Sequence, residues 1–154
     1  MFFTDPLFLG FLFGILFALP LVAAAVMDIK TMKIPGTAYL IILALGVVRI
    51  ILHGISPPTA LYGLLFCGIL LLMISLIADG IGGGDIKLFA CAGFFLGLNG
   101  ALAALFSSFF LFLCVTGGKR LFRQRNKTTL PFAPYIAAGA LISYTLIILG
   151  VIAN

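Results

Sequence analysis

Two stretches of 20 residues without a charged side chain, at positions 7–26 and 59–78, constrain the fold of this chain more than any other feature. At a rise of about 1.5 Å per residue, a helix of that length crosses a hydrocarbon core of about 30 Å. Only 8% of the residues are charged and 64% are hydrophobic, whereas about a quarter of a water-soluble domain is usually charged. The sequence therefore predicts an all-α, polytopic integral membrane protein whose residues 1–154 form one membrane-embedded domain.

The remaining apolar runs bring the predicted number of transmembrane helices to six. These helices are expected at residues 7–26, 37–52, 59–78, 88–98, 101–115 and 135–152. The run 88–115 could also form one long tilted helix, because only the Asn-Gly pair at 99–100 interrupts it. A short first helix in this run would indicate a region where the bilayer is locally thin or water-filled.

Basic residues favour two helices over one in the run 88–115. Five of the nine Lys and Arg residues lie at 119–127. A turn at 99–100 places this cluster on the same side as Lys30, Lys33 and Lys87, and the positive-inside rule assigns that side to the cytosol. We therefore predict six helices with both termini outside, N-out and C-out. The basic cluster at 119–127 is expected to contact anionic lipids, not nucleic acid.

Arg49 and His53 lie on the outer side in this topology. Arg49 is near the outer end of its helix, where its long side chain is expected to snorkel to the interface. His53 is the only histidine, and its position opposite the basic cluster disfavours a catalytic role. The three cysteines fall in apolar runs at irregular spacing, which predicts neither a disulfide framework nor a metal site.

The nine residues 79–87, with the sequence DGIGGGDIK, form the longest break in hydrophobicity in the first two thirds of the chain. Glycine loses backbone entropy in a helix but accepts positive φ and close contact with another backbone. The stretch is therefore expected to be a loop suited to binding. Asp85 opens the next apolar run, where free amide groups and the helix dipole favour its ionised form. A flexible turn with Asp85 as the helix N-cap is the alternative.

The predicted topology brings Asp28 and Asp85 to the same membrane face, although 57 positions separate them. Two facing carboxyl groups cannot both ionise easily, so they share a proton. One can then deprotonate a water molecule while the other protonates a peptide carbonyl, as in aspartic proteases. A Ser–His or Cys–His nucleophile would need His53, which is expected on the opposite face. The alternative is that the two acids merely mark helix ends at the interface.

Three motifs in this order resemble those of the bacterial type IV prepilin leader peptidases, which are membrane aspartic proteases of the GxGD type. The first is Asp28 followed by Ile-Pro at 34–35, the second is Gly-x-Gly-Asp-x-Lys at 82–87, and the third is Pro-Phe-x-Pro at 131–134. The resemblance covers nearly the whole chain. One difference is Gly36, which stands where the family commonly has Asn and so lacks that residue's helix-capping side chain.

The resemblance implies an endopeptidase that removes the basic leader of prepilins or pseudopilins at the cytosolic face of the plasma membrane. Asp28 and Asp85 match the catalytic pair of the family. The residues expected to bind substrate or position the loop are Asp79, Gly82, Gly83, Gly84 and Lys87. The resemblance implies no metal and no other cofactor.

Longer members of the family carry an N-terminal segment with paired cysteines and also methylate the new N-terminus. This chain has no room for such a segment and resembles the short, peptidase-only form found with tight-adherence (Flp) pili, or the archaeal preflagellin peptidases. N-methyltransferase activity is not expected. The alternative from another class is a small membrane transporter, or a pilus or secretion assembly subunit, that binds cations through Asp28, Asp79 and Asp85. All three acids lie at the ends of apolar runs and not near the bilayer midplane, which favours the peptidase.

Overall fold

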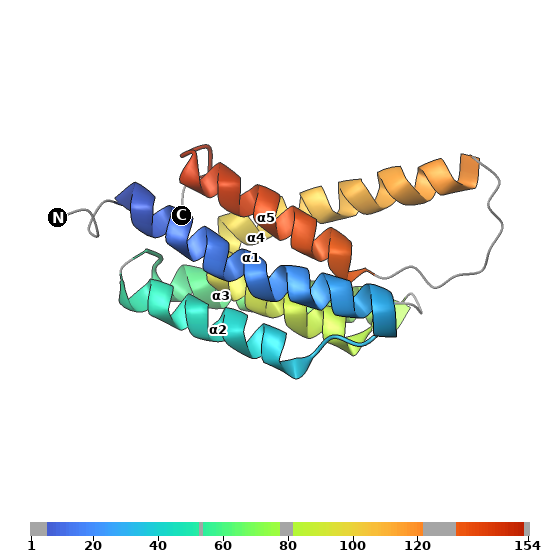
Figure 1. The fold of residues 1–154 in the computed structure, drawn as a ribbon, viewed down its shortest axis with the longest axis horizontal. Helices are drawn as coiled ribbons and strands as arrows, with labels where there is room; N and C mark the ends of the chain where they lie inside the picture. The colour runs from blue at the N-terminus through green and yellow to red at the C-terminus, as the bar shows by residue number, and fades with distance from the viewer. Residues whose placement is uncertain (1–5, 53, 78–81, 122–131, 153–154) are drawn as a thin grey trace.

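The computed structural model describes residues 6–52, 54–77, 82–121 and 132–152, and every regular element within them is an α-helix (Figure 1). The five helices are α1 (Pro6–Thr31), α2 (Gly36–Ile51), α3 (Pro57–Ile77), α4 (Gly83–Leu121) and α5 (Ala133–Ile148). The helices form a bundle in which the start of α1 lies beside the end of α5 (Figure 1). The predicted all-α fold is therefore confirmed.

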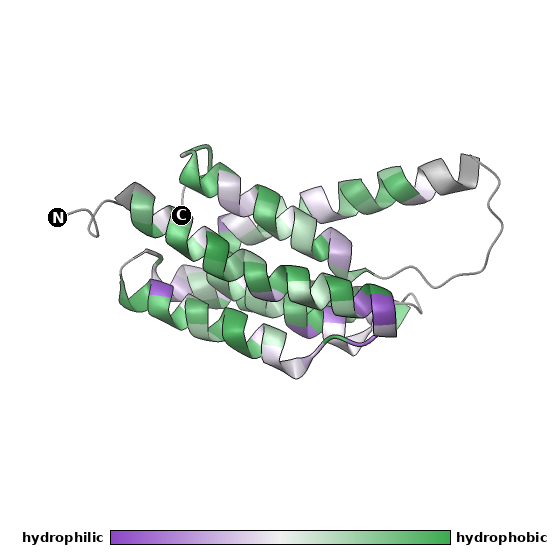
Figure 2. Cartoon of the chain, viewed as in Figure 1, coloured by the Kyte–Doolittle hydropathy of each residue, from purple (hydrophilic) through white to green (hydrophobic). Residues whose placement is uncertain are grey.

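The surface of the bundle is apolar along its length. Three helices are long and apolar enough to cross a membrane, over Phe8–Thr31, Pro57–Ile77 and Gly83–Gly117, whereas α2 and α5 are apolar but shorter. Figure 2 shows hydrophobic residues throughout the bundle and hydrophilic residues gathered where α1 ends and α4 begins. Phe11, Leu19 and Ile77 are more than half exposed, as expected of side chains that face lipid.

α1 extends five residues beyond its predicted end at residue 26, so that Asp28 lies in its last turn and not in the connection that follows. The helix ends at Thr31 because Met32 adopts a left-handed φ of 53°. The Met32 N–H still donates a hydrogen bond to the backbone oxygen of Asp28, at 2.9 Å. Pro35 then holds the chain extended, with φ −66° and ψ 135°, immediately before α2 begins.

α4 folds back on itself at Gly97, whose φ of 76° and ψ of 175° are not helical. Positive φ is disfavoured for residues that carry a Cβ, so a glycine suits this break. It divides α4 into a first arm, residues 83–96, and a second arm, residues 98–121, about 21 Å and 36 Å long at the helical rise. The turn predicted at 99–100 is therefore present, two residues earlier than expected.

The second arm of α4 returns along α5, so the two arms run in opposite directions (Figure 1). Near the turn, the Ser143 hydroxyl donates to the backbone oxygen of Gly100 at 2.6 Å. Further along, the Ser107 hydroxyl donates to the backbone oxygen of Gly139 at 3.2 Å. Because the residue numbers rise on one helix as they fall on the other, the helices are antiparallel. This places the start of α5 at the same end of the bundle as the end of α1 and the start of α4.

The first arm of α4 crosses α3 with almost no side chain between the two backbones. A Cβ placed on Gly93 would lie 2.5 Å from the backbone oxygen of Gly63. One turn further, a Cβ placed on Gly68 would lie 3.4 Å from the Cβ of Ala90. Close approach at small residues is how helices associate in a bilayer, where burial of apolar surface gives little driving force.

We expect Gly93→Ala to destabilise the protein by more than about 2 kcal/mol, because the added methyl group meets backbone that cannot rotate away. The matched control is Gly117→Ala, since a Cβ on Gly117 has no neighbour within 4 Å. Alanine favours a helix over glycine by about 1 kcal/mol, so this control should be neutral or slightly stabilising. Thermal unfolding of the two variants in detergent measures the difference. Equal unfolding temperatures would show that the crossing can relax.

Arg49 is buried inside the bundle, and the prediction that it snorkels to the outer interface is wrong. Its side chain is 7% exposed, and its Nη1 donates to the backbone oxygen of Phe95 at 2.6 Å. Its guanidinium carbon lies 5.1 Å from the centre of the Phe95 ring and 5.3 Å from that of Tyr144. Phe95 lies two residues before the break at Gly97, where the next helical turn supplies no regular donor. Arg49 therefore satisfies a carbonyl that the reversal of α4 leaves open.

Candidate active site

Asp28 and Asp85, which are 57 positions apart and were predicted to share a membrane face, meet at the end of the bundle where α1 ends and α4 begins. Both are buried, with 6% and 7% of their surface exposed. They are close enough for the charge of Asp28 to act on the Asp85 carboxyl group. Burial of two acidic side chains together at one end of an apolar bundle costs free energy. Their presence there therefore indicates a function.

The Asp28 carboxylate is held by the start of α5. Its Oδ2 accepts a hydrogen bond from the backbone N–H of Ala133, at 3.2 Å and across 105 positions of the chain. Ala133 is the first residue of α5, and the preceding Phe132 provides no side-chain cap. Asp28 thus supplies from another helix the negative charge that a helix N-terminus favours. Sequence reasoning missed this partner, because a backbone donor has no signature in the sequence; the available signal was the Pro-Phe-x-Pro motif beside it.

Asp85 is the third residue of α4, so the alternative that made it the N-cap is wrong. Its backbone N–H bonds to the Gly82 oxygen at 3.0 Å. Its Oδ1 atom is buried and has no hydrogen-bond partner within the described residues. A buried carboxyl oxygen without a partner is unfavourable. It can accept a hydrogen bond from a water molecule, or it can take up a proton and then donate to a substrate carbonyl. Asp28 is thus anchored to the protein, whereas Asp85 has an oxygen available for chemistry.

The glycine stretch is helical at its end, so the prediction that all of 79–87 forms a loop is wrong there. Gly83 and Gly84 begin α4, and neither they nor Gly82 has a positive φ. A Cβ on Gly84 would lie 3.3 Å from the Cβ of Ile34, so this glycine lets the chain before α2 approach the first turn of α4. A Cβ on Gly82 would lie 3.4 Å from Asp85 Oδ2, whereas Gly83 has open space around it.

Lys87 is directed toward α2. Its Nζ lies 6.0 Å from the centre of the Tyr39 ring, which is within the range of a cation–π contact. Asp79, His53 and the basic cluster at 119–127 lie wholly or largely outside the described residues, so their predicted roles stay predictions. Within the described ranges, no three His, Cys, Asp or Glu side chains gather closely enough to hold a metal ion.

The fold and the site together define a class: a helical membrane protein with a pair of buried carboxyl groups contributed by two different helices. Within that class, residues 7–117 match the family model described as the type IV leader peptidase family. The chain belongs to this family, as its three motifs suggested.

A curated relative supports the assignment. The chain is 38% identical over 139 residues to a protein from Bacillus subtilis (strain 168) named prepilin leader peptidase/N-methyltransferase. The similarity covers 85% of this chain and 54% of the relative, so the chain spans about half of the relative's length. No solved structure matches the chain.

Proposed function

We propose that the protein is a membrane aspartic endopeptidase that cleaves the leader of type IV prepilins or pseudopilins at the cytosolic face of the plasma membrane. The observation that carries the proposal is the buried pair of Asp28 and Asp85, in which one carboxyl group is anchored by α5 and the other has an oxygen without a partner. Membership of the type IV leader peptidase family supports the reaction class. The alternative of a transporter or assembly subunit is not favoured by that membership.

The proposed chemistry needs one ionised and one protonated carboxyl group. The carboxylate removes a proton from a water molecule, and the oxygen of that water forms a bond to the carbon of the scissile carbonyl. The protonated carboxyl group gives its proton to the carbonyl oxygen, so that a neutral tetrahedral diol forms. Collapse of the diol breaks the C–N bond. The leaving nitrogen takes up a proton from the carboxyl group that accepted one earlier, and a diol hydroxyl returns its proton to the other carboxylate as the carbonyl forms again.

Each residue of the site has a part in this scheme. Burial of the pair excludes bulk water, which strengthens the interaction of the carboxyl groups with a developing charge. The Ala133 N–H holds Asp28 in a fixed orientation. Asp79 and Lys87 are proposed to position the substrate or the segment before α4. Gly82 keeps the approach to Asp85 free of a side chain, Gly83 leaves open space for the substrate, and Gly84 admits Ile34 beside the first turn of α4.

The test of the proposed reaction is co-expression of the protein with a type IV prepilin. A shortened pilin should accumulate, and N-terminal sequencing should place the cleavage between the basic leader and the hydrophobic stretch. A prepilin that stays full length while the protein is inserted in the membrane would contradict the proposal. Methylation of the new N-terminus can be read by mass spectrometry in the same experiment and is not expected.

We further propose that the chain crosses the membrane six times, with the two arms of α4 as separate crossings and both termini outside. The first arm, at about 21 Å, is shorter than a hydrocarbon core of about 30 Å, so the bilayer beside Asp85 would be thinned or replaced by water. The basic cluster at 119–127 would then lie in the cytosol, where anionic lipids attract each cation by about 1 kcal/mol.

Cysteine labelling tests this topology in a variant without the three native cysteines. Lys30→Cys and Arg123→Cys should react with a membrane-impermeant reagent only from the cytosolic side. Ser56→Cys and Asn99→Cys should react only from outside, and the structure leaves both positions exposed. If residues 99 and 123 are labelled from the same side, the two arms of α4 are not separate crossings.

A further inference from the structure

We infer that Tyr39, near the start of α2, is a positioning residue for the reaction. Its ring holds the Lys87 ammonium group and thereby fixes the helical turn that carries Asp85. The inference rests on the proposed peptidase function and deepens it, because it assigns Lys87 to the first turn of α4 and not to the substrate.

The two carboxyl groups are held in different ways. Asp28 accepts a hydrogen bond from Ala133, whereas Oδ1 of Asp85 has no partner within the described residues. Asp85 is the third residue of α4, and the two helical residues before it are glycines, which have no side chain to pack. The first N–H groups of a helix also lack partners within the helix. The orientation of Asp85 therefore depends on contacts that other segments make with its turn.

The chain at the start of α2 supplies two such contacts. A Cβ on Gly84 would lie 3.3 Å from the Cβ of Ile34, so Ile34 packs against the residue that precedes Asp85. The Nζ of Lys87, two residues after Asp85, lies 6.0 Å from the centre of the half-buried Tyr39 ring. One short segment thus contacts α4 on both sides of Asp85 along the chain.

The same segment is also joined to Asp28. The Met32 N–H donates to the backbone oxygen of Asp28 at 2.9 Å, and Ile34 follows two residues later. The chain from 28 to 39 therefore connects the turn that carries one carboxyl group with the turn that carries the other. A reaction that uses both groups needs them at a fixed separation, because a small misplacement of reacting groups slows the chemical step.

Gly36 leaves space for the Tyr39 ring. A Cβ on Gly36 would lie 3.0 Å from the Tyr39 hydroxyl oxygen and 3.5 Å from the ring carbon that carries it. The Tyr39 side chain therefore lies back over the first residue of α2. A larger side chain at position 36 would displace the ring and with it the contact to Lys87.

The first test compares Tyr39→Leu and Tyr39→Phe in cleavage of a prepilin by the whole chain in lipid. Tyr39→Leu removes the ring and should lower kcat by roughly two- to fivefold, which corresponds to one exposed cation–π contact. KM should stay close to that of the parent, because the contact orients Asp85 and does not bind substrate. Tyr39→Phe keeps the ring and should keep the kcat of the parent. A higher KM with an unchanged kcat would assign the contact to substrate binding and overturn the inference.

Double variants show whether Tyr39 acts through Lys87. Lys87→Met should lower kcat as Tyr39→Leu does, and the double variant should be no slower than either single one, because each change alone breaks the contact. Gly36→Val keeps both partners but displaces the ring, so it should lower kcat in the parent and not in Tyr39→Leu. Losses that multiply in the double variants would overturn the inference. If Tyr39→Leu does not accumulate, Lys87→Met decides, because the Lys87 side chain is exposed.

Hydrogen exchange tests the contact without cleavage. Exchange of backbone amides reports local opening of a helix. The amides of residues 83–87 should exchange faster in Tyr39→Leu than in the parent or in Tyr39→Phe, and the amides of the second arm of α4 should not change. Mass spectrometry of peptides from the protein in detergent measures the difference.

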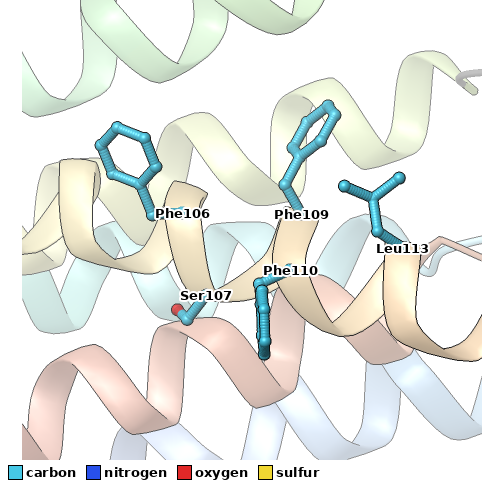
Figure 3. A pocket seen from close by; sticks show the side chains of 5 residues that line it. All are labelled: Phe106, Ser107, Phe109, Phe110 and Leu113. Atoms are coloured by element: carbon cyan, nitrogen blue, oxygen red, sulfur yellow. The ribbon is translucent and has the colours of Figure 1, made fainter.

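Two matched controls remove a ring from the outer surface of the bundle. Tyr62→Leu and Phe110→Leu change side chains that are 57% and 68% exposed. Phe110 belongs to α4, as Asp85 does, but it projects from the second arm (Figure 3). There it lines an open apolar groove together with Phe106, Ser107, Phe109 and Leu113. Both controls should keep the kcat and the amide exchange of the parent.

The outcomes separate the two proposals. If the unsubstituted protein cleaves no prepilin, the proposed function fails, and the role of Tyr39 in the reaction fails with it. If cleavage proceeds but Tyr39→Leu keeps the kcat of the parent, the positioning role alone is overturned. Faster exchange of residues 83–87 with an unchanged kcat also overturns it, because the contact then stabilises α4 without serving the reaction.

Discussion

Asp28→Asn and Asp85→Asn are each expected to abolish prepilin processing. A positioned acid or base contributes about 10²- to 10⁴-fold to a reaction, and removal of either group from a pair that acts as a unit removes the effect of both. Asn at position 28 keeps an oxygen that can accept the Ala133 N–H, so the start of α5 should stay in place. The ratio of mature to full-length pilin measures the loss, and immunoblotting of membranes verifies that each variant is inserted.

Two matched variants show whether the loss belongs to the pair. Asp79→Asn should slow cleavage without abolishing it, because Asp79 is assigned to positioning and not to proton transfer. Lys30→Gln changes an exposed charge two residues from Asp28 and should leave cleavage close to that of the parent. The assignment of the pair is wrong if Asp79→Asn is inactive while Asp28→Asn or Asp85→Asn still cleaves.

Charge and periodicity in the sequence predicted the features of the fold that depend on the membrane. The reversal of α4 was expected because the basic cluster at 119–127 had to return to the side of Lys30, and the structure turns at Gly97. The distribution of charge also predicted that Asp28 and Asp85 meet. The first helix ends near Asp28, and the helix that follows Asp85 starts from the same side of the membrane. These predictions needed only the lengths of the apolar runs and the distribution of charge.

The features that the sequence did not predict all depend on packing between helices. The glycines before Asp85 were expected to form a loop that contacts another backbone, whereas Gly84 lies in α4 and makes room for the side chain of Ile34. A Cβ on Gly84 would lie 3.3 Å from the Cβ of Ile34. The partner of Asp28 is a backbone N–H, which every residue except proline carries. The Gly63–Gly93 crossing is likewise invisible in one sequence, because any pair of glycines in two apolar helices could serve.

Arg49→Ala is expected to destabilise the fold by about 3 kcal/mol. It removes a charged donor from the Phe95 carbonyl and a cation from two aromatic rings, and a buried carbonyl without a partner costs about 1–3 kcal/mol by itself. A cation–π contact away from water adds about 2 kcal/mol. The Ala side chain is smaller and neutral, so its burial costs less free energy, and this offsets part of the lost stability. The buried Cys67 thiol, left as the only cysteine, reports unfolding through its reaction with a thiol reagent in increasing denaturant.

Three further variants identify which property of Arg49 stabilises the fold. Arg49→Lys keeps a charge and a donor and should lose less stability than Arg49→Ala. Arg49→Met fills a similar apolar volume but leaves the Phe95 oxygen without this donor, so it should resemble Arg49→Ala if the hydrogen bond dominates. Lys33→Ala removes an exposed cation and should have no measurable effect.

The position of Arg49 also predicts what its loss should spare. It packs against Phe95 and Tyr144, at the opposite end of the bundle from Ala133 and the two aspartates. The fraction of Arg49→Ala that stays folded should therefore cleave prepilin at the rate of the parent. Normal stability together with lost cleavage would instead assign Arg49 to the reaction, because a buried charge that does not stabilise the fold must act on the substrate or on the movement that admits it.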